Sequence, residues 1–210
     1  MPDANIVVFD HPLIQHKLTW LREGSTNPRA FRALMAQIAG LMVYEVTRHF
    51  PSDPVEIETP MEPMTGSRLR GTITIVPVLR AGLGMAEGVM EVMPEARVGH
   101  LGMARNEETL EPMAYLNKLP ADLDAGPVIL VDPMLATGGS AVAALEMLRD
   151  AGAHDLRFMC LVASPEGISR IREAEPDLVI YTAALDRQLN EKGYILPGLG
   201  DAGDRLYGTV

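Results

Sequence analysis

Short continuous apolar runs alternate with helical patterns through most of the chain. The runs are typical of strands that are buried on both faces of a sheet. They span residues 72–78, 98–101, 128–131, 156–163 and 178–183. Apolar residues at helical spacing lie between them, near residues 84–93, 140–151 and 165–174. This alternation predicts an α/β fold, in which a parallel sheet is joined by right-handed crossovers and carries helices on both faces.

The N-terminal part of the chain predicts a long helix. Asn27 and Pro28 suit the cap and the first position of a helix, and apolar residues follow at helical spacing as far as Val46. We expect this helix to end near Phe50, before Pro51. No repeat or linker interrupts the chain, so we predict a single domain. It comprises an N-terminal arm with helices (1–70), a core sheet (71–185) and a C-terminal segment (186–210).

The most informative stretch is VILVDPMLATGGS, residues 128–140. Asp132 stands where a buried strand should end, and small residues, hydroxyls and two glycines precede the next helix. Backbone N–H groups in such a turn can converge on an anion, with help from the helix dipole. An ordinary glycine-containing loop is the alternative, but the acid, the hydroxyls and the glycines occur together. The stretch therefore predicts a phosphate site.

The sequence of residues 128–140 excludes two common nucleotide-binding loops. A nucleoside triphosphatase loop needs a lysine after its last glycine, and a dinucleotide fold needs GxGxxG. Gly82-Leu83-Gly84 supplies only the first half of the second pattern. What remains is a cradle for one phosphate with a carboxylate just upstream, which suits a sugar phosphate.

The overall composition narrows the function classes. The 210 residues include 18 Lys and Arg against 28 Asp and Glu, for a formal charge of -10, which argues against binding nucleic acid through its phosphates. No stretch resembles a membrane span or a signal peptide, so we expect a cytoplasmic protein without a membrane partner. The single cysteine, Cys160, cannot form a disulfide within the chain and suits a small buried apolar position.

The stretch Val131–Ser140 resembles the PRPP motif of the type I phosphoribosyltransferases, where PRPP is 5-phospho-α-D-ribose 1-diphosphate. Its Asp-Pro-Met form is similar to that of uracil phosphoribosyltransferases. Further blocks resemble the same family in the same order, so that the resemblance covers nearly the whole chain. These blocks are residues 11–19, 77–85, 99–105 and 189–205.

The resemblance implies a role for each matching residue. Arg80 and Arg105 would hold the diphosphate, Asp132 the ribose hydroxyls, and residues 136–140 the 5'-phosphate. The catalytic set would be Arg80, Arg105, Asp132 and Asp201. The full PRPP set would be Arg80, Arg105, Asp132, Pro133, Met134, Leu135, Ala136, Thr137, Gly138, Gly139, Ser140 and Asp201. Uracil would lie against Ile195, Gly200, Asp201 and Ala202.

The resemblance also implies Mg²⁺ as cofactor, held by Asp201 through water and diphosphate. Pro133 takes the place of a second acid in the general family motif, so Mg²⁺ dependence is expected to be looser. We interpret residues 106–120, which include Glu107, Glu108, Thr109, Tyr115 and Lys118, as a flap over the site. A solvated charged hairpin is the equal alternative.

The expected activity is the synthesis of UMP and diphosphate from uracil and PRPP. Two alternatives stay open: a regulatory protein of this fold that binds RNA or a nucleotide effector, and a purine-base phosphoribosyltransferase. The resemblance further suggests a homodimer or higher homo-oligomer and GTP as a possible effector.

Overall fold

The computed structural model describes residues 5–105 and 112–209. Its centre is a sheet with the strand order β1-β11-β10-β8-β4-β6-β7, in which β5 also pairs with β4 and β9 with β10. All these pairs are parallel except β6 with β7. The strands are β1 (Ile6–Val8), β4 (Thr74–Leu79), β5 (Arg97–Val98), β6 (His100–Arg105), β7 (Pro112–Lys118), β8 (Val128–Val131), β9 (Met134–Leu135), β10 (Leu156–Ala163) and β11 (Val179–Leu185).

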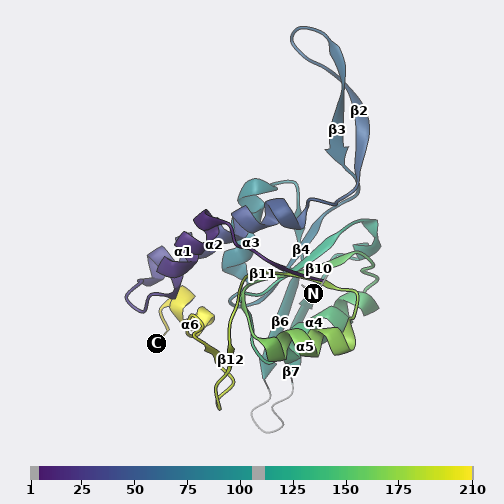
Figure 1. The fold of residues 1–210 in the computed structure, drawn as a ribbon. Coiled ribbons are helices and arrows are strands. Elements are labelled where there is room, and N and C mark those ends of the chain that lie inside the picture. The colour runs from purple at the N-terminus through teal and green to yellow at the C-terminus, as the bar shows by residue number, and fades with distance from the viewer. Residues whose placement is uncertain (1–4, 106–111, 210) are drawn as a thin grey trace.

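Helices cover both faces of this sheet (Figure 1). The first core cluster joins α1, α2, α3 and α6 to one face, and the second joins α4 and α5 to the other. The helices are α1 (Pro12–Arg22), α2 (Pro28–Val46), α3 (Leu83–Val92), α4 (Gly139–Asp150), α5 (Pro165–Ala174) and α6 (Ala202–Tyr207), with a 3₁₀ turn at Leu123–Ala125. The predicted α/β class, with a mostly parallel sheet between helices, is confirmed.

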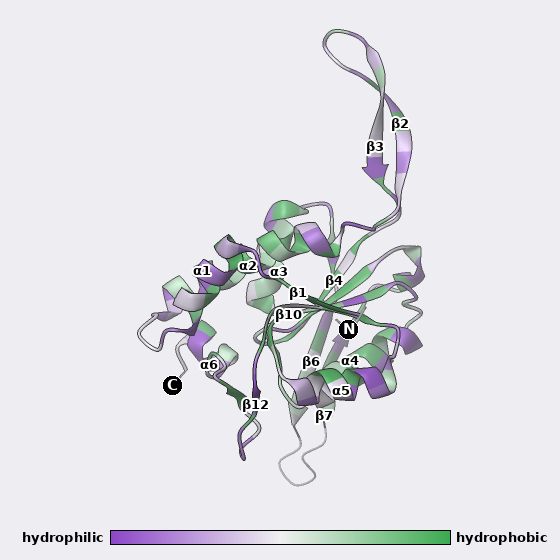
Figure 2. Cartoon of the chain, in the orientation of Figure 1, coloured by the Kyte–Doolittle hydropathy of each residue, from purple (hydrophilic) through white to green (hydrophobic). Residues whose placement is uncertain are grey.

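Strand β8 shows why a continuous apolar run was the right signal. All four of its residues are buried. Ile129 and Val131 pack into the first cluster, whereas Val128 and Leu130 pack into the second. Since successive side chains of a strand point to opposite faces, a strand between two helical layers must be apolar at every position. Figure 2 shows the apolar colouring on the inner strands and on the inward sides of the helices.

The helix starts follow the capping signals in the sequence. Asn27 accepts a hydrogen bond from the Ala30 N–H at 3.0 Å, as its position before Pro28 predicts. The predicted end of this helix, near Phe50, was wrong by about one turn, because the helix ends at Val46. Thr47 takes over as the C-cap, and its hydroxyl bonds back to the carbonyl of Val43 at 2.9 Å.

Several elements were not predicted from the hydrophobic pattern. Before and within the main sheet they are α1, the antiparallel hairpin of β2 (Ser52–Glu58) and β3 (Pro63–Leu69), the edge strand β1, β7 and the short β9. In the C-terminal segment they are β12 (Gln188–Leu189), β13 (Ile195–Leu196) and α6. The hairpin projects from the rest of the molecule (Figure 1). Because β1 pairs with β11, the sheet is not confined to residues 71–185.

The segment interpreted as a flap is in part a strand. Residues 112–118 form β7, which pairs antiparallel with β6. Residues 106–111 lie outside the described part, and with them Glu107, Glu108 and Thr109. The run 98–101 is likewise two strands, β5 and β6, separated at Gly99.

The C-terminal segment after β11 is tied to the first helix. Arg22 forms a two-pronged ion pair with the buried Asp186, at 2.8 and 2.7 Å, and also donates to the carbonyl of Gly198. Beyond Asp186 follow the short antiparallel pair β12 (Gln188–Leu189) and β13 (Ile195–Leu196), and then α6. Among the described residues, no helix has the length and apolar character needed to cross a membrane.

Candidate active site

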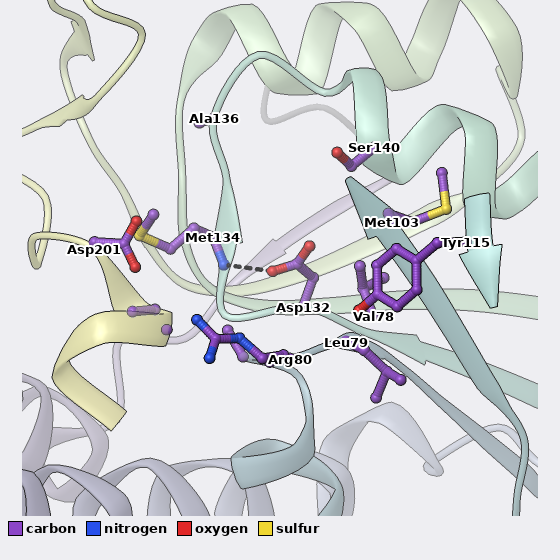
Figure 3. Close-up of a pocket in the computed structure, with 13 residues that line it drawn as sticks. Val78, Leu79, Arg80, Met103, Tyr115, Asp132, Met134, Ala136, Ser140 and Asp201 are labelled. Carbon is purple, nitrogen blue, oxygen red and sulfur yellow. Dashed lines mark hydrogen bonds between the residues drawn. The ribbon is translucent and has the colours of Figure 1, made fainter. Parts of the chain in front are cut away.

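The carboxyl ends of β4 and β8 border a cavity of about 520 Å³ (Figure 3). These strands are neighbours, with Pro77 opposite Val131, yet the chain leaves β4 towards β6 and leaves β8 towards β10. Such a switch in direction is where open α/β sheets bind ligands. The described residues that line the cavity are Val78, Leu79, Arg80, Ala81, Met103, Tyr115, Asp132, Met134, Ala136, Ser140, Asp201, Ala202 and Gly203.

The loop after β8 has the form that its sequence predicts, a strand, a turn and a helix start. Gly138 has φ +78°, a conformation that favours glycine, and a Cβ there would lie 2.8 Å from the side chain of Arg170. Gly138 is the N-cap residue of α4 and has no side chain that could cap the helix. The N–H groups of the first helical turn therefore donate to no N-cap side chain, and with the helix dipole they suit an anion.

Residues from the start of α5 brace this loop from behind. The fully buried Ser164 donates its hydroxyl to the carbonyl of Ala136 at 2.6 Å, and its backbone N–H donates to the carbonyl of Leu135 at 2.9 Å. The same hydroxyl accepts from the Gly167 N–H and so caps α5. A Cβ at Gly167 would lie 2.5 Å from the Ala136 carbonyl oxygen, so the helix end and the loop are in close contact.

Asp132 lies directly after β8 in the wall of the cavity. Burial raises the pKa of this carboxyl from 3.8 to about 7, and the hydrogen bond that it accepts from the Met134 N–H at 3.3 Å only partly opposes the shift. A pKa near 7 means that both the protonated and the charged form are populated at neutral pH. In its charged form it offers acceptors to two hydroxyl groups, as the diol of a sugar requires.

Arg80 follows β4 on the other side of the strand switch. Its side chain is exposed, and among the described residues it has no ion-pair partner. Figure 3 shows its guanidinium beside the start of α6. The turn that presents Arg80 needs Gly82, because a Cβ there would lie 2.6 Å from the carbonyl oxygen of Val131. The backbone of Arg105 ends β6, and its side chain lies outside the described part.

Asp201 has a structural partner as well as a place in the cavity wall. Its carboxylate accepts from the Asp204 N–H at 2.9 Å and so caps α6. Ala202, which is buried, follows it in the wall. Ile195 packs in the core, and Gly200, at φ +78°, forms the turn before Asp201. Of the four residues expected at uracil, Asp201 and Ala202 thus line the cavity, whereas Ile195 and Gly200 are not among the residues that line it.

The residues expected at PRPP divide in the same way. Those that line the cavity are Arg80, Asp132, Met134, Ala136, Ser140 and Asp201. Pro133 and Leu135 are buried behind the loop, and Thr137, Gly138 and Gly139 form its turn into α4. The structure therefore brings most of this set to one place. The side chain of Arg105 lies outside the described part, so its position relative to the cavity is not included.

Few of the described side chains that line the cavity could serve as metal ligands. Within the described ranges, no group of three or more His, Cys, Asp or Glu side chains is placed to hold an ion. Two carboxylates, Asp132 and Asp201, line the wall. This set fits Mg²⁺ only if a substrate supplies further oxygen ligands, since Mg²⁺ requires about six.

Comparison with known proteins decides the family. The family model described as uracil phosphoribosyltransferase matches residues 7–209. The chain belongs to the uracil phosphoribosyltransferase family. A uracil phosphoribosyltransferase from Macrococcus caseolyticus is 56% identical over 98% of this chain and 99% of its own length. One from Streptococcus mutans is 57% identical over 96% and 97%.

Solved structures with the same fold include a close match to this uracil phosphoribosyltransferase family member. The AQ2163 protein from Aquifex aeolicus matches with a TM-score of 0.92 at 40% identity, over 96% of this chain and 97% of that one. A hypoxanthine-guanine phosphoribosyltransferase from Bacillus anthracis matches at 0.53 and 12% identity, over 76% and 80%. The second likeness shows the fold alone.

Several residues around this phosphoribosyltransferase cavity were missed at the sequence level. Met103 and Tyr115 enter from β6 and β7, and Tyr115 had been noted only as part of a flap. Ser164 stands before Pro165, a helix-start signal that could have revealed its cap but not its bond to the loop. No sequence signal points to Tyr207, whose hydroxyl donates to the carbonyl of Arg80 at 3.2 Å.

Proposed function

We propose that this chain transfers the phosphoribosyl group of PRPP to uracil and releases UMP and diphosphate. One observation carries the proposal. The loop after β8 with Asp132, and Arg80, which has no ion-pair partner within residues 5–105 and 112–209, face one cavity at the strand switch, in a chain of the uracil phosphoribosyltransferase family. A sugar with a phosphate at each end needs two anion sites with a hydroxyl acceptor between them.

The proposed roles follow the charges around the cavity. The N–H groups of residues 136–140 bind the 5'-phosphate, and Asp132 accepts from the ribose hydroxyls. Arg80 and Arg105 bind the diphosphate. Negative charge grows on this leaving group as it departs, and guanidinium groups hold such charge with paired hydrogen bonds.

The reaction needs no covalent nucleophile from the protein. The bond from the anomeric carbon to diphosphate breaks, a cationic sugar forms, and a ring nitrogen of uracil bonds to that carbon and loses its proton. Cys160 takes no part, because it is fully buried in the second core cluster and burial raises its pKa to about 12. Ile195, Gly200, Asp201 and Ala202 form the proposed uracil side, where the Asp201 carboxylate also favours the cation.

Mg²⁺ is the proposed cofactor, and it enters with the substrate. When bound, it would neutralise diphosphate charge and so favour its departure. Asp201 is the proposed contact, through water. Its carboxylate also caps α6, which limits its freedom to turn towards an ion. A covering role for residues 106–120 is likewise proposed, since excluding water protects the cationic sugar.

A turnover assay with purified protein tests the function. Uracil, hypoxanthine and guanine are each supplied with PRPP, and product nucleotide is quantified with and without Mg²⁺ and GTP. We expect UMP to form, with the purine bases at less than one-hundredth of that rate. Faster turnover of a purine base would establish the rival enzyme. No turnover of any base, with retention of RNA in a gel shift at physiological salt, would establish the regulatory alternative.

The same assay decides whether GTP is an effector. We also propose that the protein self-associates and acts in the cytoplasm. Exposed apolar side chains that lie close together on the projecting hairpin support self-association, because an exposed apolar patch marks a contact surface. Ile57, Met61 and Met64 are 37%, 91% and 47% exposed. Light scattering coupled to gel filtration gives the mass in solution.

A further inference from the structure

The C-terminal helix α6 is fixed in place on both of its sides. Arg32 donates to the carbonyl of Leu206 at 2.7 Å, and the Leu206 side chain is buried beside Gly84 of α3. The guanidinium of Arg205 lies over the ring of Phe31, 4.4 Å from its centroid, and donates to the carbonyl of Leu199. The next residue, Tyr207, therefore starts from a well-anchored backbone.

Tyr207 makes two contacts with one residue, Arg80. Its hydroxyl donates to the Arg80 carbonyl at 3.2 Å, and its ring lies 5.4 Å from the carbon of the Arg80 guanidinium. Burial raises the pKa of Tyr207 above its usual 10, so the hydroxyl is a donor throughout the neutral range. One contact fixes the backbone of the turn, and the other supports the charged end of the side chain.

A support of this kind matters for an exposed arginine. A free arginine side chain samples many rotamers, and ordering it around an anion costs conformational entropy. An aromatic face attracts the guanidinium without neutralising it, whereas a carboxylate partner would compete with the anion. Among the described residues Arg80 has no such carboxylate in an ion pair.

We propose that Tyr207 is a positioning residue that holds Arg80 ready for the diphosphate group. This inference rests on the proposed role of Arg80. It extends the site to Tyr207, which is 127 positions from Arg80 in the sequence. It also links α6, whose N-terminal end has Asp201 as its cap, to the turn after β4 that presents Arg80.

The test separates the two contacts and asks whether both act through Arg80. Tyr207→Phe removes only the hydroxyl, and Tyr207→Leu removes the ring as well. Each is made alone and together with Arg80→Ala, and calorimetry measures the Kd for inorganic diphosphate. Tyr44→Leu is the matched control, since Tyr44 lies in α2, is not among the residues that line the cavity, is also exposed, and has its ring 5.8 Å from the guanidinium carbon of Arg48. Thermal unfolding checks that every variant folds.

The expected result is a Kd for diphosphate about tenfold higher in Tyr207→Leu and about threefold higher in Tyr207→Phe. Neither change should weaken diphosphate binding further once Arg80 is alanine, and Tyr44→Leu should have no effect. Equal losses with and without Arg80 would overturn the inference, because Tyr207 would then act on the general structure. So would unchanged binding in both Tyr207 variants while Arg80→Ala still weakens it. If Arg80→Ala itself left diphosphate binding unchanged, the proposed role of Arg80 would fail, and this inference with it.

Discussion

The two loops that face each other across the strand switch are supported in different ways. The loop after β8 is held by its neighbour in the sheet, through backbone bonds to β10 and the buried hydroxyl of Ser164. The turn after β4 presents an exposed arginine, whose support is Tyr207 at the end of the chain. The 5'-phosphate is kept through the reaction, whereas the diphosphate leaves. A cradle of backbone N–H groups suits the first group, and a positively charged side chain that is held in position suits the charge that grows on the second.

The largest expected effect is on catalysis and comes from the β4 side. Arg80→Ala should lower kcat/KM for PRPP by about 100-fold, roughly 3 kcal/mol, because a charge-assisted contact to the leaving group is lost. Its stability should change by less than about 0.5 kcal/mol, since the side chain is exposed. Steady-state kinetics and urea unfolding measure both. Arg68→Ala, at an exposed position in β3, is the control. A kcat/KM within threefold of the parent would return Arg80 to the status of a surface cation.

A change on the β8 side should lower the stability of the protein as well as its affinity for PRPP, unlike Arg80→Ala, which should leave stability nearly unchanged. Gly167→Ala puts a Cβ 2.5 Å from the Ala136 carbonyl oxygen, and the fold must shift, at a cost of about 2 kcal/mol. The KM for PRPP should rise because the loop moves. Gly24→Ala is the matched control, as nothing lies within 4 Å of its new Cβ. Unfolding curves that coincide for the two variants would contradict close packing of α5 on the loop.

Removing only the hydroxyl of the brace should have a smaller effect. Ser164→Ala leaves the Ala136 carbonyl without its donor and uncaps α5, which should raise the KM for PRPP about tenfold and leave the KM for uracil within twofold. Ser67→Ala, on the exposed face of the hairpin, should change neither. A parallel rise in both KM values would mean that Ser164 supports the fold in general rather than the loop.

The smallest expected effect concerns the pH dependence of stability. The folded-state pKa of Asp132, about 7, exceeds its ordinary value of 3.8, so its contribution to stability is fully present below about 3.8 and is lost as the pH rises through 7. Asp132→Asn removes this loss. Between pH 5 and 8 the parent should therefore lose about 1 kcal/mol more than the variant, a value reduced for the partial exposure of the site. Denaturant unfolding without substrate checks it, and matching pH profiles would contradict a destabilised carboxylate.

The same two loops show how far sequence reasoning reaches. The β8 loop was predictable because its signals are local: four apolar residues that fill a strand, an acid at the strand end, and Gly138 where the backbone requires positive φ. The resemblance to the family added site residues from other parts of the chain, including Asp201 and Ala202, which do line the cavity.

What was missed depends on contacts between distant parts of the chain. Ser164 and Ala136 are 28 positions apart, and Tyr207 and Arg80 are 127 apart. The edge strand β1 exists because β11 offers it an open edge, and its three residues are too few to give a pattern. The hairpin is exposed on most of its side chains, and the alternation of apolar and acidic residues in it is confined to residues 55–58, which is too short to mark a strand packed on a core.

The central claim is that the β8 loop binds the 5'-phosphate and the β4 turn binds diphosphate. The most direct measurement is calorimetric titration of ribose 5-phosphate and of diphosphate, separately, into the parent protein, Ser164→Ala and Arg80→Ala. The account predicts a crossed result, in which Ser164→Ala weakens ribose 5-phosphate about tenfold and leaves diphosphate within twofold, while Arg80→Ala does the reverse. Equal weakening of both ligands by either variant would contradict the separate roles of the two loops.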